Sequence, residues 1–350
     1  MKRVTLLSAL VALMVGLVPL APIPTSATTR MPGVASLDAT LPGDIARGPG
    51  GNMWFTVVKR NKVGRITPRG HVTLFSIPTP RGEPLAIAAG PDGNVWFSER
   101  AGNRIGRITP AGRTTEFALP RAGSKPLGIA AGPDGNLWFV EEGARRVGRI
   151  TPRGAIAEFA LPAARGDLRM QDIAAGPDGN LWFTDGRVDG CSADPARGRI
   201  GRVTPSGRIT EYTVPTDYAN PFTIVAGPDG NLWFGETVGN ADVVGRVTPA
   251  GRFSQYTVPT ALVDLYDLTA GPDGNVWYTR PGGSVIGRVT PRGAITETPL
   301  ALQATALTNG PTNVATGPDG ALWFTELAEG RIGRATLAGR VTEYAIPSRP

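Results

Sequence analysis

The stretch Gly132–Glu141, GPDGNLWFVE, decides the fold, because close copies of it occur seven times along the chain. Its proline and second glycine fit the second and fourth positions of a tight turn, and the apolar run after them fits a β-strand. The copies are 42 to 51 residues apart, which indicates a repeat architecture. Every tryptophan of the protein lies six residues after the first glycine of a copy: Trp54, Trp96, Trp138, Trp182, Trp233, Trp277 and Trp323.

Each repeat contains four short β-rich runs and no helical periodicity. In the third repeat these runs are Pro126–Gly132, Asn136–Glu141, Arg146–Pro152 and Ile156–Pro162. Units of this length with four strands are typical of propeller blades. The sequence therefore predicts an all-β fold, a seven-bladed β-propeller of four-stranded antiparallel blades over residues 42–350.

A ring of blades must close, because an open ring exposes the edges of its first and last sheets. The C-terminal segment Arg340–Pro347 matches the fourth strand of the repeat. The segment Ser36–Pro42 also resembles that strand, so two ends of the chain compete for the outer edge of the seventh blade. We expect the C-terminal segment to occupy it, because its match to the repeat is better.

Residues 1–27 have the features of an export signal. Lys2 and Arg3 precede an apolar run that is shorter than the roughly 20 residues of a membrane-spanning helix, and small residues lead to Ala27. An uncleaved membrane anchor is the alternative. We expect cleavage near Ala27, a secreted, extracytoplasmic protein without a membrane span, and a linker or extra edge strand over residues 28–41.

Cysteine and charge restrict the partners of the chain. Cys191 is the single cysteine, so no internal disulfide forms, and it is either a surface residue or a link between two molecules; we expect a monomer. The net charge of +7 comes mainly from arginine. Such a surface suits anionic wall polymers or acidic ligands. Because many arginines recur at one position of the repeat, we interpret them as architectural, and their spread over all blades disfavours nucleic-acid binding.

The two faces of the predicted ring differ in how much their loops vary. The GPDG and TPxG turns share one face and hardly change, whereas the loops between the second and third strands grow to fifteen residues at Gly186–Ile200. Binding residues tend to lie on loops held by a rigid scaffold. We therefore expect a ligand at the variable face.

Two positions of the repeat place polar groups near that face. The first is the last residue of the second strand, where acids either bind a ligand or cation or pair with the repeated arginines; its occupants are Val57, Glu99, Glu141, Asp185, Glu236, Arg280 and Glu326. The second is near the start of the first strand. There Asp44, Asp172, Asp267 and Asn313 predict oxygen ligands for Mg²⁺ or Ca²⁺ at the channel mouth, with polar capping of strand ends as the alternative.

The segments Arg104–Pro120, RIGRITPAGRTTEFALP, and Lys125–Glu141, KPLGIAAGPDGNLWFVE, resemble the streptogramin lyases, the virginiamycin B lyase family. The resemblance extends over residues 42–347. It implies a seven-bladed propeller that opens the macrocyclic lactone of a type B streptogramin by elimination. It also implies that Mg²⁺, histidines and glutamates act on the substrate.

This chain departs from the family at the positions that carry the reaction. Tyr266 and Thr312 stand where the resemblance implies histidines, and Gly310 and Leu327 stand where it implies acids. The sole histidine, His71, follows a turn on the constant face. The catalytic set of the family is therefore incomplete here.

The sequence favours a secreted binding protein with the streptogramin lyase scaffold. Its ligand would be a small molecule, a peptide or a cell-envelope component. The candidate ligand-binding residues are Glu99, Glu141, Asp185, Glu236, Tyr266, Arg280 and Thr312. The alternative is a divergent metal-dependent lyase or a lactonase, in which Glu326 and Asp267 are the candidate catalytic residues.

Overall fold

A computed structural model gives the structure of the chain. It describes residues 42–162, 168–187, 197–238, 241–259, 265–302, 310–326 and 330–347. The expected signal peptide at 1–27, the linker at 28–41 and Cys191 lie outside the described residues. No helix in the described part of the chain is long and apolar enough to cross a membrane.

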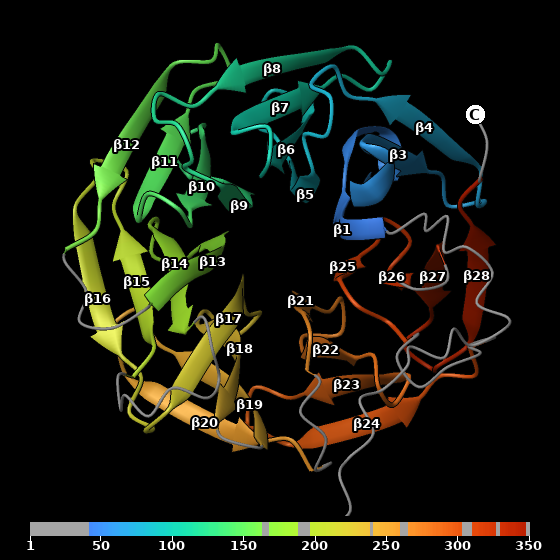
Figure 1. Cartoon of the computed structure of the whole chain (residues 1–350). Helices are drawn as coiled ribbons and strands as arrows, with labels where there is room; N and C mark the ends of the chain where they lie inside the picture. The colour runs from blue at the N-terminus through green and yellow to red at the C-terminus, as the bar shows by residue number, and fades with distance from the viewer. Residues whose placement is uncertain are drawn as a thin grey trace, which may run out of the picture. The chain divides into compact units, whose positions relative to one another are not determined.

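The described residues form seven four-stranded antiparallel sheets around a central channel, which confirms the predicted propeller (Figure 1). Blade one contains β1 (Pro42–Arg47), β2 (Met53–Val57), β3 (Lys62–Ile66) and β4 (Val72–Ser76), with the short 3-10 helices η1 (Pro49–Gly51) and η2 (Val58–Arg60). Blade two contains β5 (Pro84–Ala89), β6 (Val95–Glu99), β7 (Arg104–Ile108) and β8 (Thr114–Ala118). Blade three contains β9 (Pro126–Ala131), β10 (Leu137–Glu141), β11 (Arg146–Ile150) and β12 (Ile156–Ala160).

The remaining blades follow the same order from the channel outward. Blade four contains β13 (Leu168–Ala175), β14 (Leu181–Arg187), β15 (Arg199–Val203) and β16 (Ile209–Thr213). Blade five contains β17 (Ala219–Ala226), β18 (Leu232–Val238), β19 (Ala241–Val247) and β20 (Phe253–Thr257). Blade six contains β21 (Leu268–Ala270), β22 (Val276–Arg280), β23 (Val285–Val289) and β24 (Ile295–Pro299). Blade seven contains β25 (Val314–Thr316), β26 (Leu322–Glu326), β27 (Arg331–Ala335) and β28 (Val341–Ala345).

The GPDG turn forms because its side chains satisfy local donors. In blade three, Asp134 Oδ1 accepts a hydrogen bond from Trp138 Nε1 at 3.0 Å, and Asn136 Nδ2 donates to Asp134 Oδ2 at 2.8 Å. Gly135 has a φ of 74°, a conformation that glycine adopts without steric cost. The turn thereby fixes the indole and the start of β10.

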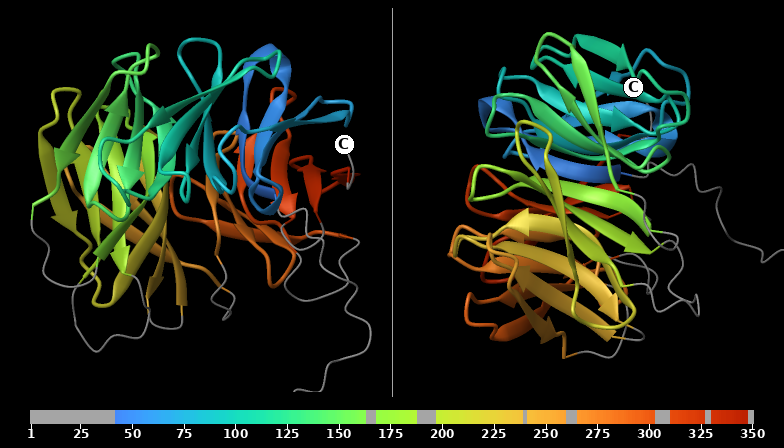
Figure 2. Two further views of the ribbon diagram at one scale, coloured as in Figure 1. Left: turned by 45° about the horizontal axis from the view of Figure 1, so that its top comes forward. Right: turned by 90° about the vertical axis from the view of Figure 1, so that its left-hand side faces the viewer.

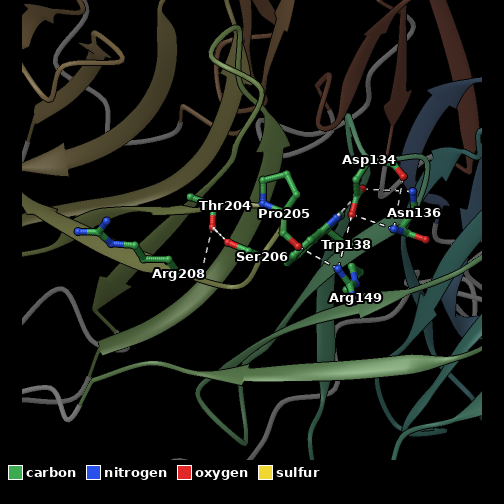
Figure 3. Close-up of polar contacts among 8 residues, drawn as sticks. All are labelled: Asp134, Asn136, Trp138, Arg149, Thr204, Pro205, Ser206 and Arg208. Carbon is green, nitrogen blue, oxygen red and sulfur yellow. Dashed lines mark hydrogen bonds and ion pairs between the residues drawn. The ribbon is translucent and has the colours of Figure 1, made fainter.

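Neighbouring blades are joined by the arginine of the third strand. The guanidinium of Arg149 lies 5.6 Å from the ring centroid of Trp138, which is a cation–π distance. Its Nη1 donates to the carbonyl oxygen of Pro205 in the next blade at 2.9 Å (Figure 3). The architectural interpretation therefore holds for the arginines of this strand position.

Seven apolar clusters, each shared by two adjacent blades, form the core of the described residues. Between blades three and four, Trp138 packs with Met170, Phe183 and Val203, all fully buried. Burying a side chain of this kind contributes roughly 2–3 kcal/mol. The core is thus a circle of interfaces, and its rigidity fixes the strand ends that surround the channel.

The C-terminal strand closes the ring. β28 pairs with β27 as the outer strand of blade seven, as we expected. Ile346 then packs with Phe55 of blade one, and Thr325 Oγ1 donates to the carbonyl oxygen of Gly43 at 2.9 Å. Of the competing segment Ser36–Pro42, the structure describes only Pro42, which begins the inner strand β1.

Candidate functional site

A cavity of about 790 Å³ lies where the inner strands begin, at the face opposite the GPDG turns. The strands of every blade run between the two faces of the ring, so all seven inner strands deliver their first residues to this mouth (Figures 1 and 2). The lining includes Gln171, Asn220, Phe222, Leu265 and Tyr266. It also includes Asp44, Asp172, Asp267 and Asn313, and none of the described residues in it is lysine, arginine or histidine.

The three aspartates of the cavity join the inner strands of adjacent blades. Each carboxylate accepts one hydrogen bond from the next residue of its own strand and one from the strand of the following blade. The strands are irregular beside Asp44 and Asp172, which leaves backbone N–H groups near the carboxylates. The donors across the blade boundary are Ile87 N to Asp44 at 2.8 Å, Ile224 N to Asp172 at 2.9 Å and Val314 N to Asp267 at 2.9 Å.

Thr223 links two of these carboxyl groups and was not singled out by the sequence analysis. Its hydroxyl lies 2.8 Å from Asp267 Oδ1 and 3.3 Å from Asp172 Oδ2. In the sequence, Thr223 is simply the blade-five member of a position that holds aspartate in three other blades. Only the packing of successive blades brings Asp172 of blade four and Asp267 of blade six to either side of it.

Burial and mutual repulsion make the cavity aspartates weak acids. Desolvation raises the pKa of Asp172 to about 6 and that of Asp267 to about 7, and the charge of Asp172 adds to the shift of Asp267. Desolvation and the charge of Asp267 raise the pKa of Asp44 well above its usual range. The phenol of Tyr266 also has a raised pKa, through desolvation and both Asp267 and Asp44. The cavity therefore has negative character that a cationic group would relieve.

The predicted metal ligands meet in this cavity, but as structural acceptors. Asp44, Asp172 and Asp267 already use their oxygens for backbone N–H groups. Among the residues that the structure describes, no group of three or more His, Cys, Asp or Glu side chains has the geometry of a metal site. The donor set does not fit Mg²⁺ or Ca²⁺ as it stands, so the cation site stays a prediction and no chemistry is derived from it.

The acids at the end of the second strands do not lie at an accessible rim, which corrects our expectation. Glu99, Glu141, Asp185, Glu236 and Glu326 are fully buried, Arg280 is 1% exposed, and Thr312 is 3% exposed. The reason is that the loops entering each blade cover the strand end: a Cβ atom at Gly82 would lie only 2.6 Å from Glu99 Oε2. Of the predicted ligand-binding residues, Tyr266 lines the cavity, and its side chain is 42% exposed.

Polar residues of the fourth strands contact these buried groups. We did not expect these contacts from the sequence. Arg280 pairs with Glu297 at 3.1 Å, and Gln255 Nε2 donates to Glu236. In blade two, Glu99 adjoins Glu116, whose carboxylate accepts hydrogen bonds from Thr79 N at 2.9 Å and Thr79 Oγ1 at 2.6 Å. The signal was present in the sequence as a polar residue at the third place of six outer strands.

Asp185 of blade four has a different partner, because Arg145 of blade three lies beside it. The two side chains form an ion pair at 3.0 Å that joins blades three and four. Asp185 therefore pairs with an arginine as the alternative expected, but not with one of the repeated arginines. Arg145 belongs to the loop before the third strand, so it is not one of the arginines that stack on tryptophan.

The two candidate catalytic residues differ in whether they reach the cavity. Asp267 lines the cavity, whereas Glu326 lies fully buried at the end of β26 and is not part of the lining. His71 is exposed in the turn between β3 and β4, where its backbone N–H donates to Thr67 Oγ1 at 3.1 Å. That turn lies on the face opposite the cavity, so no histidine can reach a ligand there.

Comparison with known proteins relates the whole chain to one group of enzymes. The profile of the virginiamycin B lyase family matches residues 34–193 and 192–350. A streptogramin B lyase structure is 33% identical, with 88% of this chain and 95% of the other covered and a TM-score of 0.76. A catalytically inactive histidine-to-alanine variant of virginiamycin B lyase from Staphylococcus aureus, solved with quinupristin, is 34% identical, with coverages of 86% and 96% and a TM-score of 0.74.

A more distant structure shares the fold alone. Hydrazine synthase from Kuenenia stuttgartiensis is 15% identical, with 91% of this chain and 99% of the other covered and a TM-score of 0.68. No curated protein sequence matches the chain.

Proposed function

Since the chain belongs to the virginiamycin B lyase family, we propose that it is an exported propeller that binds a small ligand at the channel mouth without the histidine chemistry of its catalytic relatives. The export signal expected at residues 1–27 supports the location. The ligand is a small molecule, a peptide or a fragment of the cell envelope.

The observation that carries this proposal is the cavity itself. It has a volume of about 790 Å³, within the range of small-molecule sites, and it combines Tyr266 and Phe222 with three aspartates. Aromatic and acidic groups together favour a ligand with a cationic or hydrogen-bond-donating part. The relative whose histidine was replaced by alanine is described as inactive, and here the sole histidine, His71, lies in a turn of the opposite face.

Binding can be measured by calorimetric titration and thermal shift with quinupristin and with short amine-bearing peptides as probes. We expect saturable binding of at least one probe by the wild-type protein. Tyr266→Ala removes an exposed ring of the lining and should weaken binding about fivefold or more, since a stacked aromatic contact contributes ~1 kcal/mol or more. Leu337→Ala, at an exposed residue of the opposite face, is the matched control.

The same titrations decide whether the ligand leaves unchanged. Binding protein and ligand should separate with the ligand intact by mass spectrometry. Equal loss of binding in the Leu337→Ala control, or no binding of any probe, would count against a site in this cavity.

A divergent lyase or lactonase is the second candidate, and the pKa of Asp267 favours it. Because burial raises that pKa to about 7, Asp267 is partly ionised at neutral pH and able to accept a proton. Elimination gives an opened ring of unchanged mass, whereas hydrolysis adds the mass of one water. Incubation with a type B streptogramin and with simple lactones, with and without Mg²⁺ or Ca²⁺, distinguishes these products; turnover that disappears in Asp267→Asn would establish the enzyme and overturn pure binding.

A further inference from the structure

The structure divides the arginines of the repeat into two sets with different surroundings. Those of the third strand stack on tryptophan, and five of the seven also donate to a carbonyl oxygen of the next blade, as Arg149 does. The second set, which we name the turn arginines, has one member per blade in or directly after the turn between the third and fourth strands. The turn arginines are Arg69, Arg113, Arg153, Arg208, Arg252, Arg292 and Arg340.

The guanidinium groups of the turn arginines form no polar contact with the described residues of the fold. All seven are exposed. Within the described part of the chain, none of their side chains forms an ion pair or a hydrogen bond: the backbone N–H of Arg208 donates to Thr204 Oγ1 at 3.1 Å, but its side chain extends away from the Arg149–Pro205 contact (Figure 3). A cation without an ion pair or hydrogen bond to the described residues is available to a partner.

The position of the arginine within the turn changes while its presence does not. Arg69, Arg153 and Arg292 precede the turn glycine, and the other four turn arginines follow it. A packing role would fix the side chain at one position, as it does for the arginines of the third strand. The shared property is therefore one outward positive charge per blade.

The scaffold holds these charges in one layer. Strand order and direction are the same in every sheet, so all seven turns lie on the face opposite the cavity. The turns are fixed by their neighbours: a Cβ atom at Gly154 would lie 2.2 Å from the ring of Phe117 in the preceding blade, and Arg107 Nη1 donates to the carbonyl oxygen of Pro152 at 2.7 Å. The backbone of the array is therefore fixed before a partner arrives, so only the arginine side chains are ordered on binding.

Acidic groups on this face do not cancel the array. The acids of its turns are the GPDG aspartates, such as Asp134, which hydrogen-bonds Trp138 and lies 3.9 Å from Arg149. Blade one has Gly50 in place of that aspartate and adds the exposed Arg47 at the end of β1. The face is therefore strongly basic, whereas the cavity at the other face is acidic.

We propose that the face bearing the turn arginines docks on an anionic lipid bilayer. A planar ring of cations meets a planar layer of phosphate headgroups with all members at once, whereas a single flexible polyanion follows only an arc of the ring. Each basic residue near an anionic bilayer contributes roughly 1 kcal/mol of attraction. Docking in this orientation leaves the cavity facing away from the membrane.

Vesicle co-sedimentation tests the proposal with two matched variants. The first replaces Arg153, Arg208 and Arg252, from three successive blades, by Gln. The second replaces Lys59, Arg81 and Lys125, exposed cations of the cavity face, by Gln and changes the net charge equally. We expect the wild type and the second variant to bind vesicles containing phosphatidylglycerol and not pure phosphatidylcholine, with weaker binding at high salt. The first variant should bind on the order of a hundredfold more weakly.

Three outcomes would overturn the proposal. These are equal binding to neutral vesicles, equal losses in the two triple variants, and binding to a soluble polyphosphate chain without binding to vesicles. Circular dichroism and thermal unfolding of both variants show whether the fold is kept. The result is independent of ligand binding in the cavity, because neither triple variant changes a residue of its lining.

Discussion

Glu99 is a carboxylic acid at neutral pH, because its place inside blade two changes its chemistry. Its pKa is raised from 4.5 to about 8, chiefly by desolvation and in addition by repulsion and a hydrogen bond with the neighbouring carboxyl of Glu116. The pKa values of Glu141 and Glu236 are raised to about 7, mainly by desolvation. At neutral pH the repeated glutamate is therefore wholly or partly protonated at these positions, which the sequence alone does not reveal.

Replacing Glu99 by Gln should make the protein less sensitive to pH. In the wild type the unfolded chain releases its proton above about pH 4.5 while the folded chain keeps it to about pH 8. The folded state then holds the extra proton, so its stability falls as pH rises through this window. Glu99→Gln keeps a donor toward Glu116 and removes this component, on the order of a few kcal/mol between the two limits.

Urea unfolding at pH 5 and pH 8 measures this difference. The gain of Glu99→Gln over the wild type should be larger at pH 8. Glu83→Gln, at an exposed acid of the adjoining loop, is the control and should follow the wild type at both values. Parallel curves for Glu99→Gln and the wild type would refute a buried protonated acid.

At the scale of the element, the outer strand β24 is the one that departs from its counterparts. In six blades the tryptophan of the second strand stacks on a ring of the fourth strand, as Trp323 does on Tyr344 at 5.7 Å. In blade six that place is held by Thr298. A gap lined by Trp277, Thr298 and Leu337 results, and Trp277 is 5% exposed while the other six tryptophans are fully buried.

Thr298→Tyr should fill this gap and stabilise the protein. The turn that follows in blade seven already has Gly339, the residue that faces the ring in the other blades, so the new ring has room. A stacked pair contributes ~1 kcal/mol, and we expect Tm to rise by about 2–4 °C. Thr296→Tyr, at an exposed residue of the same strand that does not line the gap, is the control and should leave Tm unchanged.

Calorimetry compares the two substitutions directly. A lower Tm for Thr298→Tyr, or the same rise for Thr296→Tyr, would show that the gap is not the missing ring site. The comparison therefore separates filling of the gap from a general effect of added tyrosine.

At the scale of the whole molecule, stability depends on the closing strand. β28 covers β27 and supplies Tyr344 to the apolar cluster between blades seven and one, and Ile346, directly after β28, joins the same cluster. Arg331 also pairs with Glu343 across these strands at 3.0 Å. Because each blade buries its core only against its neighbours, opening one boundary exposes two faces at once.

Deleting residues 340–350 should cost several kcal/mol, at roughly 2 kcal/mol for each large apolar side chain lost, and should leave β27 as an open edge. We expect a lower Tm and association in size-exclusion chromatography. Deleting residues 1–35, which precede β1, is the matched truncation and should keep the Tm of the full chain. Equal losses in both truncations would contradict closure by the C-terminal strand.

The ring, its seven blades and the order of their strands could be predicted from the sequence. The reason is that turn chemistry and apolar–polar alternation are local properties, and they recur in all seven repeats. It also determined that one histidine exists and that it follows a turn of the constant face.

The packing of the blades determines which of the repeated polar residues a ligand can reach. Glu99 and Asp267 both stand at ends of strands, yet a neighbouring loop buries the first and the channel exposes the second to a cavity. Arg149 and Arg153 are four residues apart and equally charged, yet one is held between blades and the other faces solvent. Accessibility depends on what adjacent blades place over a side chain, and those contacts join residues about one repeat apart, beyond the reach of any local pattern.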